Sequence, residues 1–302
     1  MKKLIKVVLT VVGLAACLEI ANRSIFELAR RTHPPRKRNG ERVYNWRFGR
    51  VRYIVAGPVD APPLLLVHGV GMGAGLHEWE EVLLALSRHY RVYALDLLGF
   101  GQSEKPAVSV SAYLYSLLIH DFAKNVIGEE TFVVANNLSC SFAAVAAQMD
   151  TGAAYAPQSY RHPNEYIKKL LFLAPQSVQQ TAPTRKQVWC KKLLDCPIIG
   201  TSIYLAMTSR VLLKAYLEKF GLMKAATTAQ VDAFYAAAHH GGANARYPMS
   251  SFLTNFLYVE TDRAIEAVTQ PTCLLDNDGE SGLYAHIQNP KALYQACRKF
   301  FG

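Results

Sequence analysis

The amino-acid sequence predicts an α/β fold, with a doubly wound, mostly parallel sheet and an inserted helical lid. Continuous apolar runs at residues 64–67 and 131–135 are typical of strands covered on both faces. Amphipathic helical patterns separate such runs, and this alternation implies a parallel sheet. Between residues 176 and 270 helical patterns occur without a clear strand. That block therefore predicts a helical lid inserted between two strands of the sheet.

Further patterns predict the remaining elements in chain order. Residues 43–57 alternate between apolar and polar side chains, which predicts an antiparallel hairpin. Further strands are predicted at 91–95, 170–174 and 271–275, and helices at 113–126, 142–148, 204–220, 228–239, 250–257 and 290–301. These elements predict a core formed by residues 41–175 and 271–302, with the lid at 176–270.

Composition limits the classes of function. The chain has 302 residues, is 51% hydrophobic and carries a formal net charge of +10. Much of the excess charge lies in the first 38 residues, which predicts contact with a membrane surface or a solvated charged segment. No pattern indicates a nucleic-acid module. The six cysteines have no zinc-binding spacing, so we predict no metal and no cofactor.

Residues 1–30 are predicted to lie outside the globular core. Three lysines precede an apolar run at 7–17. The segment is interpreted as a cleaved lipoprotein-like signal ending near Cys17, as an uncleaved anchor over 4–21, or as an amphipathic surface helix over 18–29. The anchor is slightly favoured because the helical pattern continues beyond Cys17. We expect a membrane-associated protein whose orientation stays open, since basic residues flank both ends of the apolar run.

Two glycine-rich turns follow predicted buried strands. In an acyl-transfer enzyme, a turn such as His68-Gly69-Val70-Gly71 supplies a backbone N–H to an oxyanion. The same turn matches a dinucleotide fingerprint that ends at Ala74, with Asp96 as a ribose ligand. This second interpretation is weak, because another glycine turn, 99–101, directly follows Asp96.

The combination of these turns resembles the α/β-hydrolase family. The resemblance rests on His68-Gly69-x-Gly71, a helix that contains Trp79, and the pattern D-x-x-G-x-G-x-S at 96–103. It extends over about residues 43–147, then resumes at 169–175, 269–275 and 286–301. It implies a nucleophile elbow, a carboxylate after a later strand and a histidine after the last strand.

The elbow is expected within residues 133–141, although no G-x-S-x-G sequence occurs there. One alignment places Asn137 in the nucleophile slot, and asparagine tolerates the left-handed backbone of an elbow. The other makes Ser139 the nucleophile, and Cys140 is a third, weaker candidate. The family pattern assigns the oxyanion hole to the N–H groups of Val70 and Cys140.

The resemblance also assigns an acid and a base. Asp276 and Asp278 are candidates for the acid, and His286 for the base. Only five residues separate Glu280 from His286, where the family has a helix and a strand. The triad is therefore either rebuilt or broken.

Three functions follow from these expectations. The first is an esterase- or lipase-like serine hydrolase that acts on a small, ester-like, apolar substrate, because aromatic lid residues over such a sheet usually line an apolar pocket. The second is a catalytically inactive binding or scaffolding protein. A dinucleotide-binding enzyme is a distant third.

Overall fold

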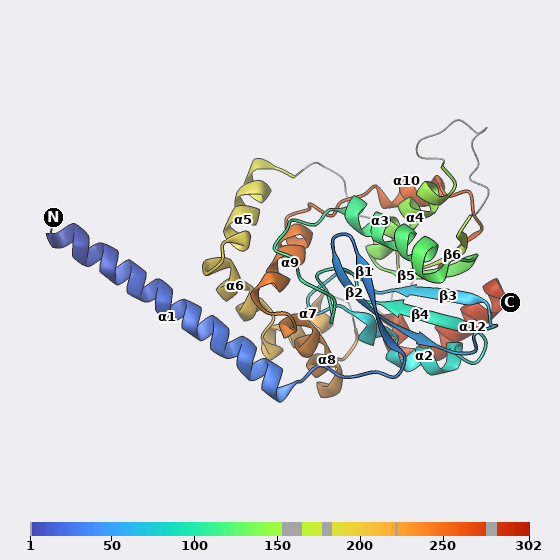
Figure 1. Ribbon diagram of the computed structural model, residues 1–302, viewed down its shortest axis with the longest axis horizontal. Helices are drawn as coiled ribbons and strands as arrows, with labels where there is room; N and C mark the ends of the chain where they lie inside the picture. The colour runs from blue at the N-terminus through green and yellow to red at the C-terminus, as the bar shows by residue number, and fades with distance from the viewer. Residues whose placement is uncertain (1, 153–164, 177–182, 221–222, 276–282) are drawn as a thin grey trace.

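A seven-stranded sheet forms the centre of the molecule (Figure 1). The computed structural model describes residues 2–152, 165–176, 183–220, 223–275 and 283–302. The strands are ordered β1-β2-β4-β3-β5-β6-β7. β1 (Glu41–Trp46) and β2 (Gly49–Ala56) form the predicted hairpin, and β2 pairs antiparallel with β4. All other pairs are parallel, which confirms the doubly wound, mostly parallel sheet.

The central strands are apolar because helices cover both of their faces. β3 (Pro63–Val67) is buried at every residue, and its neighbours β4 (Arg91–Leu95) and β5 (Thr131–Asn136) each have a single half-buried position. β6 (Ile167–Leu173) and the short β7 (Thr272–Leu275) complete the parallel part of the sheet. Parallel sheets are stable only when both faces are removed from water.

Two groups of helices cover the sheet (Figure 1). One face is packed by α3 (Ala112–Phe122), which continues into a π-helical turn (Ala123–Ile127), and by α4 (Ser139–Asp150) with α10 (Thr261–Glu266). The other face is packed by the 3₁₀ helix η1 (Leu76–Trp79), α2 (Glu80–Leu86) and the C-terminal α12 (Pro290–Phe301). α12 is amphipathic, and Leu293, Cys297 and Phe301 form its buried face.

The predicted lid segment contains short helices. They are α5 (Arg185–Asp195), α6 (Ile199–Met207), α7 (Arg210–Lys219), α8 (Thr228–His239), the 3₁₀ helix η3 (Gly242–Ala245) and α9 (Arg246–Leu253). α10 also lies within the predicted lid segment, but it packs on α4 at the sheet. The single helix predicted at 204–220 was wrong, because Ser209 is extended and separates α6 from α7. The helix predicted at 250–257 begins four residues earlier, as α9. Capping boxes at Thr184 and Thr227 fix the starts of α5 and α8.

The N-terminal residues form one long helix, α1 (Lys2–Thr32), which projects from the body of the molecule (Figure 1). Its C-terminal part packs on α6, α8 and η3. Asn22 fixes this contact, because its amide nitrogen donates to the Ile198 carbonyl at 3.3 Å and its amide oxygen accepts from Ser202. Its N-terminal part is apolar and exposed, and is long enough to cross a membrane.

Candidate active site

A sharp turn joins β5 to α4 at Asn137. This residue has a φ of 56°, in the left-handed region that most side chains avoid. Its N–H donates to the Leu173 carbonyl of the neighbouring strand at 2.9 Å, which holds the turn against the sheet. Asparagine is one of the few residues that tolerate this backbone, which is where a strand-to-helix elbow places its nucleophile. The turn therefore has the geometry expected when Asn137 occupies the nucleophile position of the elbow.

The turn after β3 packs directly against this elbow. A Cβ atom on Gly69 would lie 3.0 Å from the Asn136 amide nitrogen and 3.4 Å from the Asn137 Cβ. Gly69 therefore allows the two loops to meet where the adjacent parallel strands end. Val70, the predicted oxyanion donor, is buried in the same turn.

Ser139 is the first residue of α4 and is fully buried. Its hydroxyl donates a hydrogen bond to the main-chain carbonyl of His68 at 2.7 Å. A serine nucleophile instead shares its proton with a basic side chain. In the described geometry Ser139 thus ties α4 to the end of β3.

Cys140 is buried behind the elbow. Its thiol contacts the carbonyl oxygens of Ala135 and Leu173, and burial raises the pKa of the thiol far above its ordinary value. Its N–H donates to the Asn137 carbonyl at 3.1 Å. Cys140 would supply an oxyanion donor if Ser139 were the nucleophile. With Asn137 in the slot, the equivalent N–H belongs to Leu138.

His286 lies on the short helix α11 (Ala285–Gln288) rather than after a strand. Its ring lies against Trp79, with ring centroids 4.6 Å apart, and its Nε2 is 3.8 Å from the Oε2 of Glu78. Burial lowers the pKa of His286 to about 3, so the imidazole is neutral at physiological pH. The predicted acids Asp276 and Asp278 lie outside the described residues.

Glu78 is the site residue that the sequence analysis missed. Its Oε2 accepts hydrogen bonds from the Gly69 N–H at 3.1 Å and the Asn136 amide at 3.2 Å. Burial is the main cause that raises the pKa of Glu78 to about 8, so the carboxyl group is largely protonated at neutral pH. A glutamate at the start of an amphipathic helix is usually exposed, so nothing local distinguished it from Glu80 or Glu81.

Unpaired polar atoms are concentrated at the elbow. Glu78 Oε1, Asn136 Oδ1, Asn137 Oδ1 and His286 Nε2 are all buried without a hydrogen-bond partner among the described residues. Buried polar atoms are nearly always paired in a structural core. Their concentration beside a left-handed residue is typical of a functional site.

Asp96 ties the two glycine turns together. Its carboxylate accepts from the Leu76 N–H and from the Gln102 N–H, both at 2.7 Å. Both oxygens are thus engaged within the fold, so the ribose-binding role of the dinucleotide interpretation has no support in the structure.

A cavity of about 930 Å³ lies between α1, α8, η1 and the glycine turn at 101–102. Residues 136–141 are not part of its wall. Within the described ranges, no group of three or more His, Cys, Asp or Glu side chains could hold a metal ion.

Comparisons with known proteins agree with this fold. Residues 62–184 match a family model for the α/β hydrolase fold. The chain is 40% identical over 85 residues to the 2-hydroxy-6-oxo-6-(2'-aminophenyl)hexa-2,4-dienoic acid hydrolase of Metapseudomonas resinovorans, a match that covers 28% of this chain and 29% of the relative. It is 42% identical over 66 residues to the haloalkane dehalogenase of Mycobacterium marinum, covering 22% of each chain. These matches span less than a third of the length of the curated relatives.

Solved structures extend the likeness over most of the chain. The serine hydrolase CarC, involved in carbazole degradation, superposes with a TM-score of 0.65 at 19% identity and covers 86% of this chain and 98% of its own. A bacterial membrane phospholipase A superposes with a TM-score of 0.59 at 19% identity, covering 100% of this chain and 98% of its own. At these identities the likeness establishes the fold. The sheet order, the strained elbow after β5 and the match of residues 62–184 to the family model together show that this chain has the α/β-hydrolase fold.

Proposed function

We propose that this chain is a hydrolase that acts on a small, ester-like, apolar substrate at the elbow between β5 and α4. The observation that carries the proposal is the strained elbow between β5 and α4, which packs against Gly69 at the ends of two adjacent strands and is followed by Ser139 at the start of α4. This backbone costs about 1–3 kcal/mol and persists where the surroundings enforce it. The hydrolases and esterases among the relatives support the same class of reaction.

In this proposal Ser139 is the nucleophile and His286 the base, with Asp276 or Asp278 orienting the histidine. The reaction requires Ser139 to release its hydrogen bond to the His68 carbonyl and turn toward the substrate. His286 is neutral, but burial that lowers its pKa to about 3 makes it a weak base, so in this proposal substrate binding must also raise the pKa of the imidazole. The N–H groups of Val70 and Cys140 would stabilise the oxyanion, provided that Cys140 also releases its bond to Asn137.

The test is labelling with a fluorophosphonate probe together with hydrolysis of p-nitrophenyl esters of increasing chain length. We expect Ser139→Ala to abolish labelling and to lower kcat/KM by about 10³-fold or more. Ser141→Ala is the matched control, because Ser141 is equally buried in the same helix and its hydroxyl donates to the Leu138 carbonyl at 2.7 Å. An unlabelled wild-type protein that hydrolyses none of these esters would overturn the proposal.

A second candidate, a binding protein without chemistry, is favoured by one observation: the residue with the elbow backbone is an asparagine, which cannot form an acyl-enzyme in the usual way. If this candidate is correct, the wild-type protein is unlabelled and Asn137→Ser, which places a hydroxyl in the slot, gains labelling. Labelling of the wild-type protein at Ser139 rejects this candidate.

The N-terminal helix supports a proposal about location. An 18-residue window of α1 has a mean hydropathy of 2.2, and none of that window is buried against the rest of the chain. An exposed apolar helix of this length is stable in a bilayer and not in water. We therefore propose that α1 anchors the protein to a membrane.

A further inference from the structure

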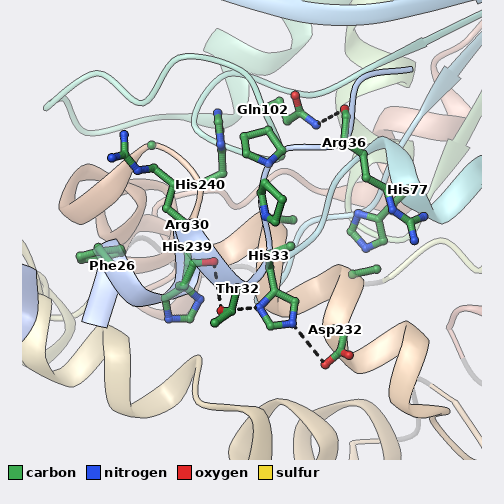
Figure 2. A pocket seen from close by; sticks show the side chains of 18 of the residues that line it. Phe26, Arg30, Thr32, His33, Arg36, His77, Gln102, Asp232, His239 and His240 are labelled. Atoms are coloured by element: carbon green, nitrogen blue, oxygen red, sulfur yellow. Dashed lines mark hydrogen bonds and ion pairs between the residues drawn. The ribbon is translucent and has the colours of Figure 1, made fainter. Parts of the chain in front are cut away.

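The cavity of about 930 Å³ is lined by elements that are distant in the sequence. The C-terminal part of α1 and the segment after it form one side, and α8 forms another (Figure 2). Arg36 and His77 lie at one end, whereas Phe26 and His239 lie at the other (Figure 2). Its volume of about 930 Å³ falls within the range of small-molecule sites.

Most of one wall has no side chain beyond Cβ. α8 presents four alanines to the cavity: Ala229, Ala233, Ala236 and Ala237. Phe26, Ala29, Pro34 and Pro35 line it from the α1 side. A smooth apolar wall of this kind fits a chain of methylene groups, because it offers dispersion contacts without polar atoms to desolvate.

Two arginines, Arg36 and Arg38, lie together at the other end of the cavity. Arg38 binds Glu80 at 2.6 Å, and Arg36 reaches the same carboxylate at 3.4 Å from a side chain that is 76% exposed. The Glu80 carboxylate is thus shared by two guanidinium groups. Elsewhere in the wall, Glu19 pairs with Arg23, Glu27 with Arg30 and Arg31, and Asp232 with Arg210. The Asp96 carboxylate instead accepts the N–H groups of Leu76 and Gln102.

The imidazole of His77 lies beside Arg36 in the cavity wall (Figure 2). His77 lines the cavity, and its Nε2 has no hydrogen-bond partner among the described residues. That nitrogen is itself buried, so the exposed guanidinium of Arg36 is the group at this end that offers donors to a ligand. A guanidinium fork suits a carboxylate or phosphate oxygen.

The cavity begins where the exposed apolar part of α1 ends. Its wall starts at Glu19 and continues to Arg38, whereas the apolar residues from Leu4 to Leu14 are exposed. With α1 in a bilayer, the cavity lies at the level of the lipid headgroups. An amphiphile in that bilayer would enter it without crossing bulk water.

We propose that this cavity binds a membrane-derived amphiphile with a single acyl chain and an anionic headgroup. The chain lies along the alanine face of α8, and the headgroup meets Arg36. A free fatty acid and a lysophospholipid share this chemistry. The site is separate from the elbow, so binding does not depend on the proposed hydrolase activity.

The experiment uses the full chain with the Ser139→Ala substitution in phosphatidylcholine nanodiscs, so that no ester is turned over. Displacement of dansyl-undecanoic acid by oleate gives the affinity, with empty nanodiscs as the background. We expect Ala233→Trp to fill the cavity and to weaken oleate binding by about tenfold or more. Val211→Trp, at a position on α7 that is 79% exposed and outside the cavity, should leave binding unchanged.

Two substitutions and two ligands test the contact between Arg36 and the headgroup. Arg36→Ala should weaken oleate binding but not the binding of oleyl alcohol, which lacks the charge, whereas Arg88→Ala, outside the cavity, should change neither. The affinities of oleate and of oleoyl-lysophosphatidylglycerol are then compared. Tighter binding of oleate identifies the ligand as a free fatty acid, and tighter binding of the lysolipid identifies it as a lysophospholipid. If Ala233→Trp does not fold, Ala229→Trp, at an exposed part of the cavity wall, replaces it. Unchanged oleate affinity in the folded tryptophan variant, or equal affinity for oleate and oleyl alcohol, overturns the proposal.

Discussion

At the residue scale, Asp96 controls how the two glycine turns meet. Its carboxylate accepts a backbone N–H from each turn, and Gly101 allows the second turn to close over it. Gly101 has a φ of +47°, and a Cβ atom there would lie 2.0 Å from the Asp96 Oδ1. The glycine is therefore required both for its backbone conformation and for space.

We predict that Gly101→Ala destabilises the fold by about 3 kcal/mol or more, because backbone strain adds to the displacement of a buried carboxylate. Gly242→Ala is the matched control, since Gly242 has a φ of +76° but a Cβ atom there would meet no other atom within 4 Å. Gly242→Ala should lower the free energy of unfolding by only about 1–2 kcal/mol, from backbone strain alone. Urea unfolding followed by tryptophan fluorescence measures both losses. Equal losses would contradict the role assigned to Asp96.

At the scale of elements, α1 combines two environments in one helix. The apolar residues from Leu4 to Leu14 are exposed, whereas Asn22 and Ala29 nearer its end are buried. The three sequence interpretations divided this segment at Cys17, Ala21 or Ala29. The structure continues the helix to Thr32, so the apolar and amphipathic parts form one element.

We predict that the double substitution Leu9→Lys and Val12→Lys releases the protein from membranes. Each lysine near the centre of a spanning helix costs about 2.5–3.5 kcal/mol of insertion free energy. Extraction of membranes with alkaline carbonate, followed by immunoblotting, measures the fraction retained. Val59→Lys, at a position that is 74% exposed and outside α1, is the control and should remain in the pellet. Retention of the double variant would show that another part of the chain anchors it.

At the scale of the whole molecule, one buried polar cluster connects four parts of the fold. Glu78 on η1 contacts the turn after β3 through Gly69, the end of β5 through Asn136, and α11 through His286. Both Glu78 and His286 are buried in their uncharged forms at neutral pH. The stability of the entire core is thus linked to protons at this cluster.

We predict that stability falls by on the order of 1–2 kcal/mol between pH 6.5 and pH 8. The pKa of Glu78 is about 8 in the folded protein and about 4.5 in the unfolded chain, so in this window only the folded state keeps the proton. His77 and His286, whose pKa values fall from 6.5 to about 3, act in the opposite direction, mainly below pH 6.5. Because their unfolded forms are still half-protonated at pH 6.5, each also offsets about 0.4 kcal/mol of the fall above that pH.

Urea midpoints across this pH range test the prediction. Glu78→Gln should remove the fall, because the amide does not titrate. Glu104→Gln is the control, since Arg50 lowers the pKa of the exposed Glu104 below 4.5 and outside the window. A fall that persists in Glu78→Gln would assign the effect to another group.

The sequence by itself determined the sheet, its parallel strands and the helical character of the lid segment. These features follow from local periodicity and from glycine turns, which depend on neighbouring residues only. The boundaries inside the lid were wrong where Ser209 interrupts a continuous apolar pattern, because a break in the backbone leaves that pattern unchanged.

Only the tertiary structure decided which side chains meet. It showed the left-handed backbone at Asn137, the contact of His286 with Glu78, and the cavity between α1 and α8. Each of these depends on segments distant in the sequence that come together when the sheet closes, and no local spacing encodes such a contact. The glycine turns could therefore be identified from the sequence, whereas the buried carboxyl group between them could not.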